Sequence, residues 1–191
     1  MKSIILIAPP AAGKGTQAAL IAKEYNIPHI SIGQLLRNEV KAKTEIGIMI
    51  QEEIKTGRLI QDDVVRKLLE NRITKWDCKN GFILDGFPRN MNQVEMLETT
   101  IKRINCEINY VILLHETKDI VKKRILGRLI CENCKTGFNL CFEETKPKEV
   151  NKCDYCGGNL VKRGDDNEAT FAKRYKVYEL ETKPIIDYYQ S

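Results

Sequence analysis

The chain opens with KSIILIAPPAAGKGT at residues 2–16. Residues 2–7 form a short and largely apolar run, which is typical of a strand buried on both faces of a parallel sheet. A turn rich in Pro and Ala follows, and a helix is predicted at about residues 14–25. Where a strand, a tight loop with Gly-Lys and a helix follow one another, backbone N–H groups face an anion and the lysine reaches towards its phosphates. The stretch therefore predicts a phosphate-binding loop in an α/β protein.

The loop departs from the generic pattern G-x-x-x-x-G-K-[ST] at two positions. Ala8 stands where the first glycine belongs, and Gly15 stands where Ser or Thr belongs, with Thr16 one position later. From these residues alone, a strand–turn–helix unit without a ligand remains an open alternative.

Further apolar strands alternate with helices along the chain, which predicts a parallel sheet covered on both faces. The expected strands are residues 29–32, 82–84 and 109–114. The expected helices are residues 33–43, 44–55, 62–74, 91–104 and 119–128, followed by a long helix from about residue 167 that Pro184 should kink.

Length and composition limit the class of protein. A chain of 191 residues allows about one domain with an insertion. The net charge of +5 comes without a polybasic block, which favours an ordinary solvated surface over a nucleic-acid site. No apolar run approaches the roughly 20 residues of a membrane helix, and the first one is shorter than the roughly 7–15 residues of a signal-peptide core. We therefore expect a cytoplasmic monomer without membrane or nucleic-acid partners.

Four of the seven cysteines form two CxxC pairs, Cys131 with Cys134 and Cys153 with Cys156. Each CxxC turn can aim two thiolates at one point, so two turns complete a tetrahedral Zn²⁺ site. Four protein ligands leave no open position, which makes the metal structural. Four incidental cysteines are the alternative. The cysteines without a partner at ligand spacing are interpreted as ordinary buried or surface residues: Cys78, Cys106 and Cys141.

Two motifs resemble a known enzyme family. Gly13-Lys14-Gly15-Thr16-Gln17 is similar to the phosphate loop of nucleoside monophosphate (NMP) kinases, and Leu84-Asp85-Gly86-Phe87-Pro88-Arg89 resembles their second signature. With the four-cysteine insertion, residues 2–189 resemble the bacterial adenylate kinases that carry a zinc-bearing lid. The resemblance implies an α/β parallel-sheet P-loop NMP kinase fold. It divides the chain into a core (1–30, 61–126 and 165–191), a helical NMP-binding insertion (31–60) and a zinc-binding lid (127–164).

The family usually continues beyond the region of residues 188–189 with one more strand and a helix. We therefore expect a sheet of four parallel strands with an unprotected edge.

The resemblance implies reversible transfer of the γ-phosphoryl group of ATP to AMP, giving two ADP, with Mg²⁺ as cofactor. Elementary chemistry agrees, since both substrates are polyanions and the acceptor phosphate is already ionised near neutral pH. The reaction therefore needs fixed cations and a dry site rather than a general base. Arginine suits this task because its planar donors bind phosphate at two points.

The family pattern carries over to individual residues. The implied ATP site comprises Gly13, Lys14, Gly15, Thr16, Arg124 and Arg128, the last two being one helical turn apart. The implied AMP site comprises Ile32, Arg37, Arg58, Ile60, Gly86, Arg89, Gln93, Arg163 and Arg174. The implied catalytic cations are Lys14, Arg89, Arg124, Arg128, Arg163 and Arg174.

Three acidic positions have two interpretations. Asp85 resembles the carboxylate that orients Mg²⁺ through water, or it is a turn or cap residue. Asp165 and Asp166 either orient arginines near a lid hinge or cap the next helix.

Some positions depart from the family. Ile32 replaces a usual Thr and Gln34 a usual Asp, and alanine at Ala8 and Ala11 replaces glycine, which adds strain if either needs φ > 0. His29 and His115 carry no partner pattern and are interpreted as structural.

Two alternative functions remain open. One is kinase activity towards CMP, UMP or another nucleoside monophosphate, although the Gln93 amide favours adenine. The other is a catalytically weakened nucleotide-binding or nucleic-acid-binding protein. The four-cysteine segment has few aromatic residues and intersperses its lysines with acids, which argues against nucleic acid.

Overall fold

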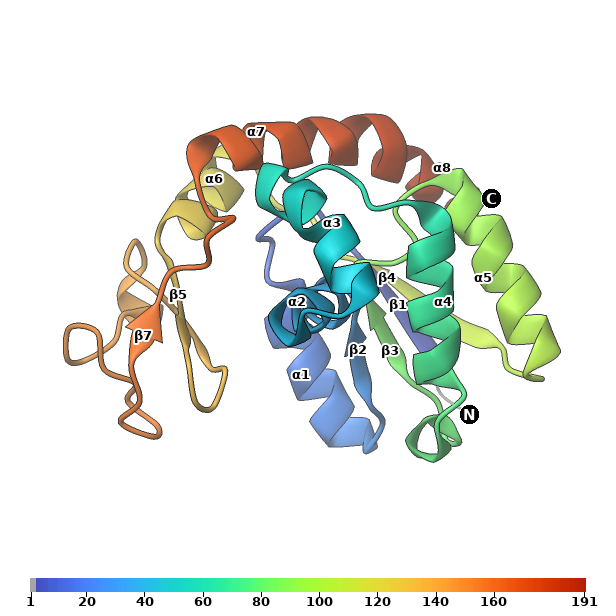
Figure 1. Ribbon diagram of the computed structural model, residues 1–191, viewed down its shortest axis with the longest axis horizontal. Helices are drawn as coiled ribbons and strands as arrows, with labels where there is room; N and C mark the ends of the chain where they lie inside the picture. Colours follow the sequence, from blue (N-terminus) through green and yellow to red (C-terminus); the bar gives the residue numbers. More distant parts are fainter. Residues whose placement is uncertain (1–2) are drawn as a thin grey trace.

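The computed structural model describes residues 3–191, so Met1 and Lys2, the latter expected to begin the first strand, lie outside the described residues. Figure 1 shows a central sheet with helices around it and a separate lid joined to it by two helices. The strands are β1 (Ser3–Ile7), β2 (His29–Ser31), β3 (Ile83–Asp85), β4 (Ile108–Leu113), β5 (Arg128–Cys131), β6 (Gly137–Asn139) and β7 (Leu160–Val161). The helices are α1 (Lys14–Tyr25), α2 (Ile32–Ala42), α3 (Glu45–Thr56), α4 (Asp62–Ile73), α5 (Met91–Arg103), α6 (Lys118–Leu126), α7 (Glu168–Val177) and α8 (Lys183–Gln190).

The central sheet has four parallel strands in the order β2-β3-β1-β4, as expected. Ile4 and Leu6 of β1 pack against α1, whereas Ile5 and Ile7 face a larger core built from α2, α3, α4, α5 and α8. Both faces of β1 are therefore covered, which explains its continuous apolar run. β4 pairs only with β1 among the described strands, and its Tyr110 is 60% exposed. The expected open edge is confirmed.

Two smaller units flank the phosphate-loop end of the sheet (Figure 1). One is the α2–α3 hairpin, which closes tightly at Gly47, where a Cβ atom would lie 2.1 Å from the Glu39 carbonyl oxygen. The other is the lid, an antiparallel sheet in the order β6-β5-β7 that connects to the core through α6 and α7.

Two predicted boundaries beside the site are wrong. Ile32 begins α2 instead of ending β2. α6 ends at Leu126, and Arg128 begins β5 instead of completing the helix. The Asn139 side chain bonds the Arg124 carbonyl oxygen at 2.7 Å, and a Cβ on Gly127 would meet Asn139 Oδ1 at 2.5 Å, so the lid ends the helix there.

The C-terminal helix is interrupted, as the proline suggested, although Pro184 itself lies in the first turn of α8. A π-helical turn, Tyr178–Thr182, separates α7 from α8. Such turns are a known cause of helix bending. Within residues 3–191, no helix combines the length and apolar character needed to cross a membrane.

Candidate active site

The phosphate loop connects β1 to α1, and its geometry is that of an anion cradle. Gly13 precedes the helix with φ of 92°. Lys14 folds back over the loop, and its Nζ donates to the carbonyl oxygens of Ala8 (3.0 Å) and Pro9 (3.3 Å). Burial lowers the pKa of Lys14 to about 8, against which the charge of Asp85 acts. An anion that displaces these two carbonyls therefore gains a partly buried cation.

Of the two alanines that replace glycine, only Ala11 occupies the left-handed region, with φ of 62°. Its side chain packs with Ala12 against Val121, Ile125 and Phe171 of the lid hinge. The expectation of strain therefore holds for Ala11 and not for Ala8.

We expect Ala11→Gly to relieve about 1 kcal/mol of backbone strain, partly offset by the lost methyl contact. The melting temperature should rise by about 2–4 °C, and ATP should bind up to about fivefold more tightly. Calorimetry and titration with ATP provide the measurements, with Ala8→Gly as the matched control. An equal gain in Ala8→Gly, or no gain in Ala11→Gly, contradicts the strain argument.

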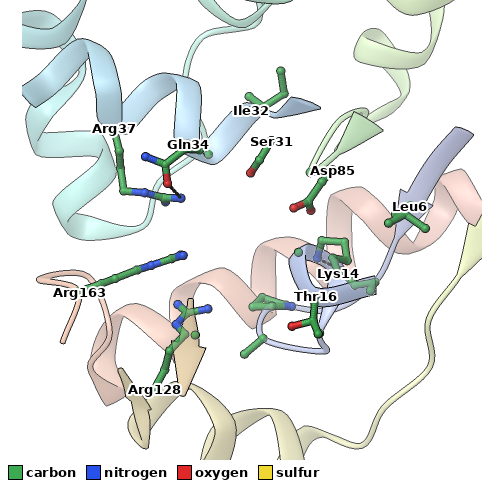
Figure 2. Close-up of a pocket in the computed structure, with 18 of the residues that line it drawn as sticks. Leu6, Lys14, Thr16, Ser31, Ile32, Gln34, Arg37, Asp85, Arg128 and Arg163 are labelled. Carbon is green, nitrogen blue, oxygen red and sulfur yellow. Dashed lines mark hydrogen bonds between the residues drawn. The ribbon is translucent and has the colours of Figure 1, made fainter. Parts of the chain in front are cut away.

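Asp85 ends β3 beside the phosphate loop, with its carboxylate directed into the cavity (Figure 2). Its Oδ2 atom lies 3.2 Å from His29 Nε2. Burial favours the neutral carboxyl, but the His29 hydrogen bond and the charge on Lys14 outweigh burial and hold the pKa of Asp85 below its usual value. Asp85 therefore presents a negative charge next to the loop lysine and caps no helix.

Arginines from several elements converge on the same space. Burial and neighbouring arginines lower the pKa of Arg163 to about 10, and burial also lowers the pKa values of Arg37 and Arg89. Figure 2 shows Arg37, Arg128 and Arg163 directed towards a common centre opposite Lys14. Cations that destabilise one another in this way are relieved by a polyanion, so the site is electrostatically arranged for phosphate.

Asp165 and Asp166 each bind one of the predicted site arginines. Arg128 donates from Nε to Asp166 at 2.7 Å and from Nη2 to the other carboxylate oxygen, and Arg174 donates to Asp165. The helix cap is Asn167 instead, whose side chain accepts from the Thr170 N–H. Of the two interpretations, orientation of arginines is therefore the one that the geometry supports.

On the other side of the cavity, Gln93 is 2% exposed and holds a neighbouring loop. Its Oε1 accepts from the Arg89 N–H at 2.8 Å, and its Nε2 donates to Asp62 Oδ1 at 2.6 Å. One amide N–H remains for a base. Arg89 in turn donates from Nε to the Gly86 carbonyl oxygen at 2.9 Å, so loop and arginine form one unit.

Two further substituted positions have local partners. Ile32 is the first residue of α2 and is buried in the core. The Gln34 side chain donates to Asn38 and accepts from Arg37.

One cavity of about 1380 Å³ brings the predicted nucleotide-site residues together. This exceeds the roughly 300–1,000 Å³ usual for a single small ligand. The predicted residues that line it are Gly13, Lys14, Gly15, Thr16, Ile32, Arg37, Arg58, Ile60, Asp85, Gly86, Arg89, Gln93, Arg124, Arg128, Arg163 and Arg174. Arg124 and Arg128 both line the cavity although they do not share a helix.

Two further lining residues contact predicted site residues and could not be found from the sequence. His29 contacts Asp85 across the β2–β3 pair, which only the strand register reveals. Phe142 lies under Arg124, with 5.6 Å from the guanidinium carbon to the ring centroid. A single aromatic residue in the lid belongs to no motif, so the sequence does not predict this contact.

The four predicted zinc ligands come together in the lid. The sulfur atoms of Cys131, Cys134, Cys153 and Cys156 all lie within 4.8 Å of one another. The Cys131–Cys156 and Cys134–Cys153 sulfur pairs are 3.4 and 3.6 Å apart, near the roughly 3.8 Å edge of a tetrahedron with Zn–S bonds of about 2.3 Å. A hydrogen bond with Thr136 lowers the pKa of Cys134 to about 6, which favours the thiolate that a metal needs. The donor set and spacing fit Zn²⁺.

A single phosphate needs few cations, yet this cavity collects its arginines from the core, the α2–α3 hairpin and the lid. Such a distribution suits two polyanionic nucleotides held face to face, and the class so defined is that of the NMP kinases. A family model described as adenylate kinase matches residues 6–191, and the chain belongs to the adenylate kinase family.

Individual relatives agree. An adenylate kinase of Clostridium botulinum is 43% identical over 187 residues, covering 98% of this chain and 86% of the relative. Those of Caldicellulosiruptor bescii (42% over 188 residues, 98% and 86% coverage) and Thermosipho africanus (43% over 188 residues, 98% and 87%) are similar.

Proposed function

We propose that the chain transfers the γ-phosphoryl group of ATP to AMP and gives two ADP in a reversible reaction. The observation that carries the proposal is one cavity that is lined by both the phosphate loop and the arginine cluster. This cavity is large enough for two nucleotides. The family and its named relatives support the same activity.

In this proposal the loop binds ATP and the opposite wall binds AMP. The backbone N–H groups around Gly13 and the Lys14 ammonium hold the β- and γ-phosphates. Arg37 and Arg89 hold the AMP phosphate, and Arg128, Arg163 and Arg174 neutralise the transferring group between them. Because the acceptor phosphate oxygen is already ionised, catalysis consists of alignment, charge stabilisation and exclusion of water.

The two nucleotide bases lie at opposite ends of the cavity in this proposal. The remaining N–H of Gln93, with Ile60 and Arg58, lines the AMP end. The stacked pair Arg124 and Phe142 offers a flat surface to the ATP base.

The lid and α2–α3 hairpin must approach each other for transfer. We propose that the chain divides at these units into a core, an NMP-binding insertion at 31–60 and a lid at 127–164. Arg128 lies where the chain enters the lid and Arg163 lies where it leaves the lid. Closure of the lid therefore brings both arginines onto the phosphates together.

Two metal ions belong to the proposal. Mg²⁺ bound with ATP supplies neutralisation of the β- and γ-phosphate charge, and Asp85 is the residue placed to orient its water shell. Zn²⁺ on the four lid cysteines is structural, because four protein ligands leave no position for a reacting water.

The acceptor specificity tests the proposal. We expect kcat/KM for AMP to exceed that for CMP, UMP and GMP at least tenfold in a coupled assay of nucleoside diphosphate formation. A preference for a pyrimidine nucleotide would assign the chain to another NMP kinase activity. Binding of ATP without any transfer would leave only a nucleotide-binding protein.

ATP affinity should depend on pH through Lys14. Its pKa of about 8 in the free site means that the ammonium is present below pH 8 and is lost as the pH rises. Bound ATP favours the charged form and raises that pKa, so binding takes up protons between about pH 8 and the ordinary lysine value of 10.5. Titration calorimetry should show affinity falling up to tenfold per unit in this window, and a flatter profile in Lys14→Arg. The same profile in both proteins contradicts this role.

A further inference from the structure

Asp85 depends on one side chain for its position. Within residues 3–191, the only hydrogen bond to its carboxylate comes from His29, whose Nε2 lies 3.2 Å from Oδ2. Lys14 does not compete for it, because its ammonium bonds two loop carbonyl oxygens instead. His29 is therefore the group that selects the orientation of this carboxylate.

The strand register explains why these two side chains meet. β2 and β3 are parallel, with Ser31 opposite Asp85 and His29 opposite Ile83. His29 and Ser31 are two residues apart and share one face of the sheet, so the imidazole lies on the same face as the carboxylate, two residues before the position opposite Asp85. The contact spans two strands that are 56 residues apart in sequence.

The His29 contact engages Oδ2 of Asp85 and leaves Oδ1 without a hydrogen bond within residues 3–191. Oδ2 lies between His29 and the phosphate loop, 3.7 Å from where a Cβ on Gly15 would lie. Both side chains line the cavity and are largely buried, with exposures of 24% for His29 and 12% for Asp85. Within residues 3–191, no hydrogen bond other than that to His29 holds this carboxylate in one orientation.

We propose that His29 is a positioning residue, whose Nε2–H fixes Asp85 Oδ2 so that Oδ1 is presented to the hydrated Mg²⁺ that accompanies ATP. The inference rests on the proposed function. It assigns His29 no contact with substrate. Loss of an outer-shell partner of this kind typically weakens metal binding by about 10–100-fold, with the lower end expected for a water-mediated contact.

The test uses the full-length protein with His29→Leu, His29→Gln and, as a matched control, His115→Leu, which replaces the exposed second histidine. The Mg²⁺ concentration for half-maximal ADP formation should rise about tenfold in His29→Leu. His29→Gln keeps an N–H donor and should return to within about threefold of the parent. His115→Leu should match the parent.

Two further readouts separate positioning from folding and from turnover. ATP binding without divalent cations should stay within about twofold in His29→Leu, while Mn²⁺ binding to the protein–ATP complex, followed by EPR, should weaken in parallel with the Mg²⁺ effect. In Asp85→Asn, the additional His29→Leu change should add little, because the two residues act as one unit.

An unchanged metal requirement in His29→Leu overturns the proposal, as does a full additive loss in the double variant or a failure of His29→Gln to recover. If His29→Leu does not fold, the Mg²⁺ requirement and the Mn²⁺ binding of His29→Gln are compared with those of Asp85→Asn, and the same criteria decide. Failure of the proposed function is a different result: the parent would bind Mn²⁺ and ATP and yet form no ADP.

Discussion

Replacing Lys14 by alanine should lower the rate of ADP formation by about 100-fold to 1,000-fold and leave the fold intact. The loss of one preorganised donor to a developing charge costs about this much in other enzymes. Lys14 contributes little to packing, since within residues 3–191 its ammonium donates hydrogen bonds to the carbonyl oxygens of Ala8 and Pro9 alone. The melting temperature should therefore change by no more than about 2 °C.

Lys14→Met is the matched control for this experiment, because it keeps the length of the side chain and removes the charge. It should be as inactive as Lys14→Ala. Near-normal turnover in either variant, with unchanged melting, would sink the assignment of the phosphate loop. Recovery of activity in Lys14→Met alone would show that bulk and not charge is needed.

Removing the lid metal should unfold the lid before it harms the central sheet. The buried core of the lid is small: Leu129, Phe138 and Leu160 pack with the two buried cysteines, Cys131 and Cys153. So small an apolar cluster cannot stabilise a unit of this size, and the proposed Zn²⁺ would supply the rest. Activity should then fall through loss of lid closure, because Arg128 and Arg163 would no longer move together.

The measurement combines metal content, calorimetry and ADP formation in the parent and in Cys153→Ala. We expect one Zn²⁺ per chain in the parent, and in Cys153→Ala a separate, earlier transition for the lid with strongly reduced activity. Cys141→Ala is the matched control, since Cys141 lies in the lid outside the cluster, and it should behave like the parent. A parent without metal, or an unchanged lid in Cys153→Ala, contradicts a structural zinc site. An exchangeable water on the metal would show that its role was misjudged.

Much of this architecture is predictable because its signals are local. A continuous apolar strand, a Gly-Lys loop and paired CxxC turns each depend on neighbours in the sequence, and the sheet, loop and cysteine cluster appear where expected. Arg128 shows the limit of such signals. Its spacing from Arg124 is that of one helical turn, but contacts from Asn139 in the lid end the helix before Arg128 is reached.

Side-chain partners across the sheet are harder to predict. His29 has no motif, and its contact with Asp85 depends on the register of two strands that are distant in sequence. Ala11 is similar, because the sequence shows which glycines are replaced but not which of them needs positive φ. For Asp165 and Asp166 the sequence left two interpretations open, and only the folded structure shows that both residues pair with arginines.

The most direct test of phosphoryl transfer between two nucleotides in this one cavity is ³¹P NMR of the protein with ATP, AMP and Mg²⁺. We expect that each ATP consumed yields two ADP, that inorganic phosphate does not accumulate, and that ADP alone is converted back to ATP and AMP. Consumption of ATP with release of inorganic phosphate and unchanged AMP, or no consumption at all, would contradict it.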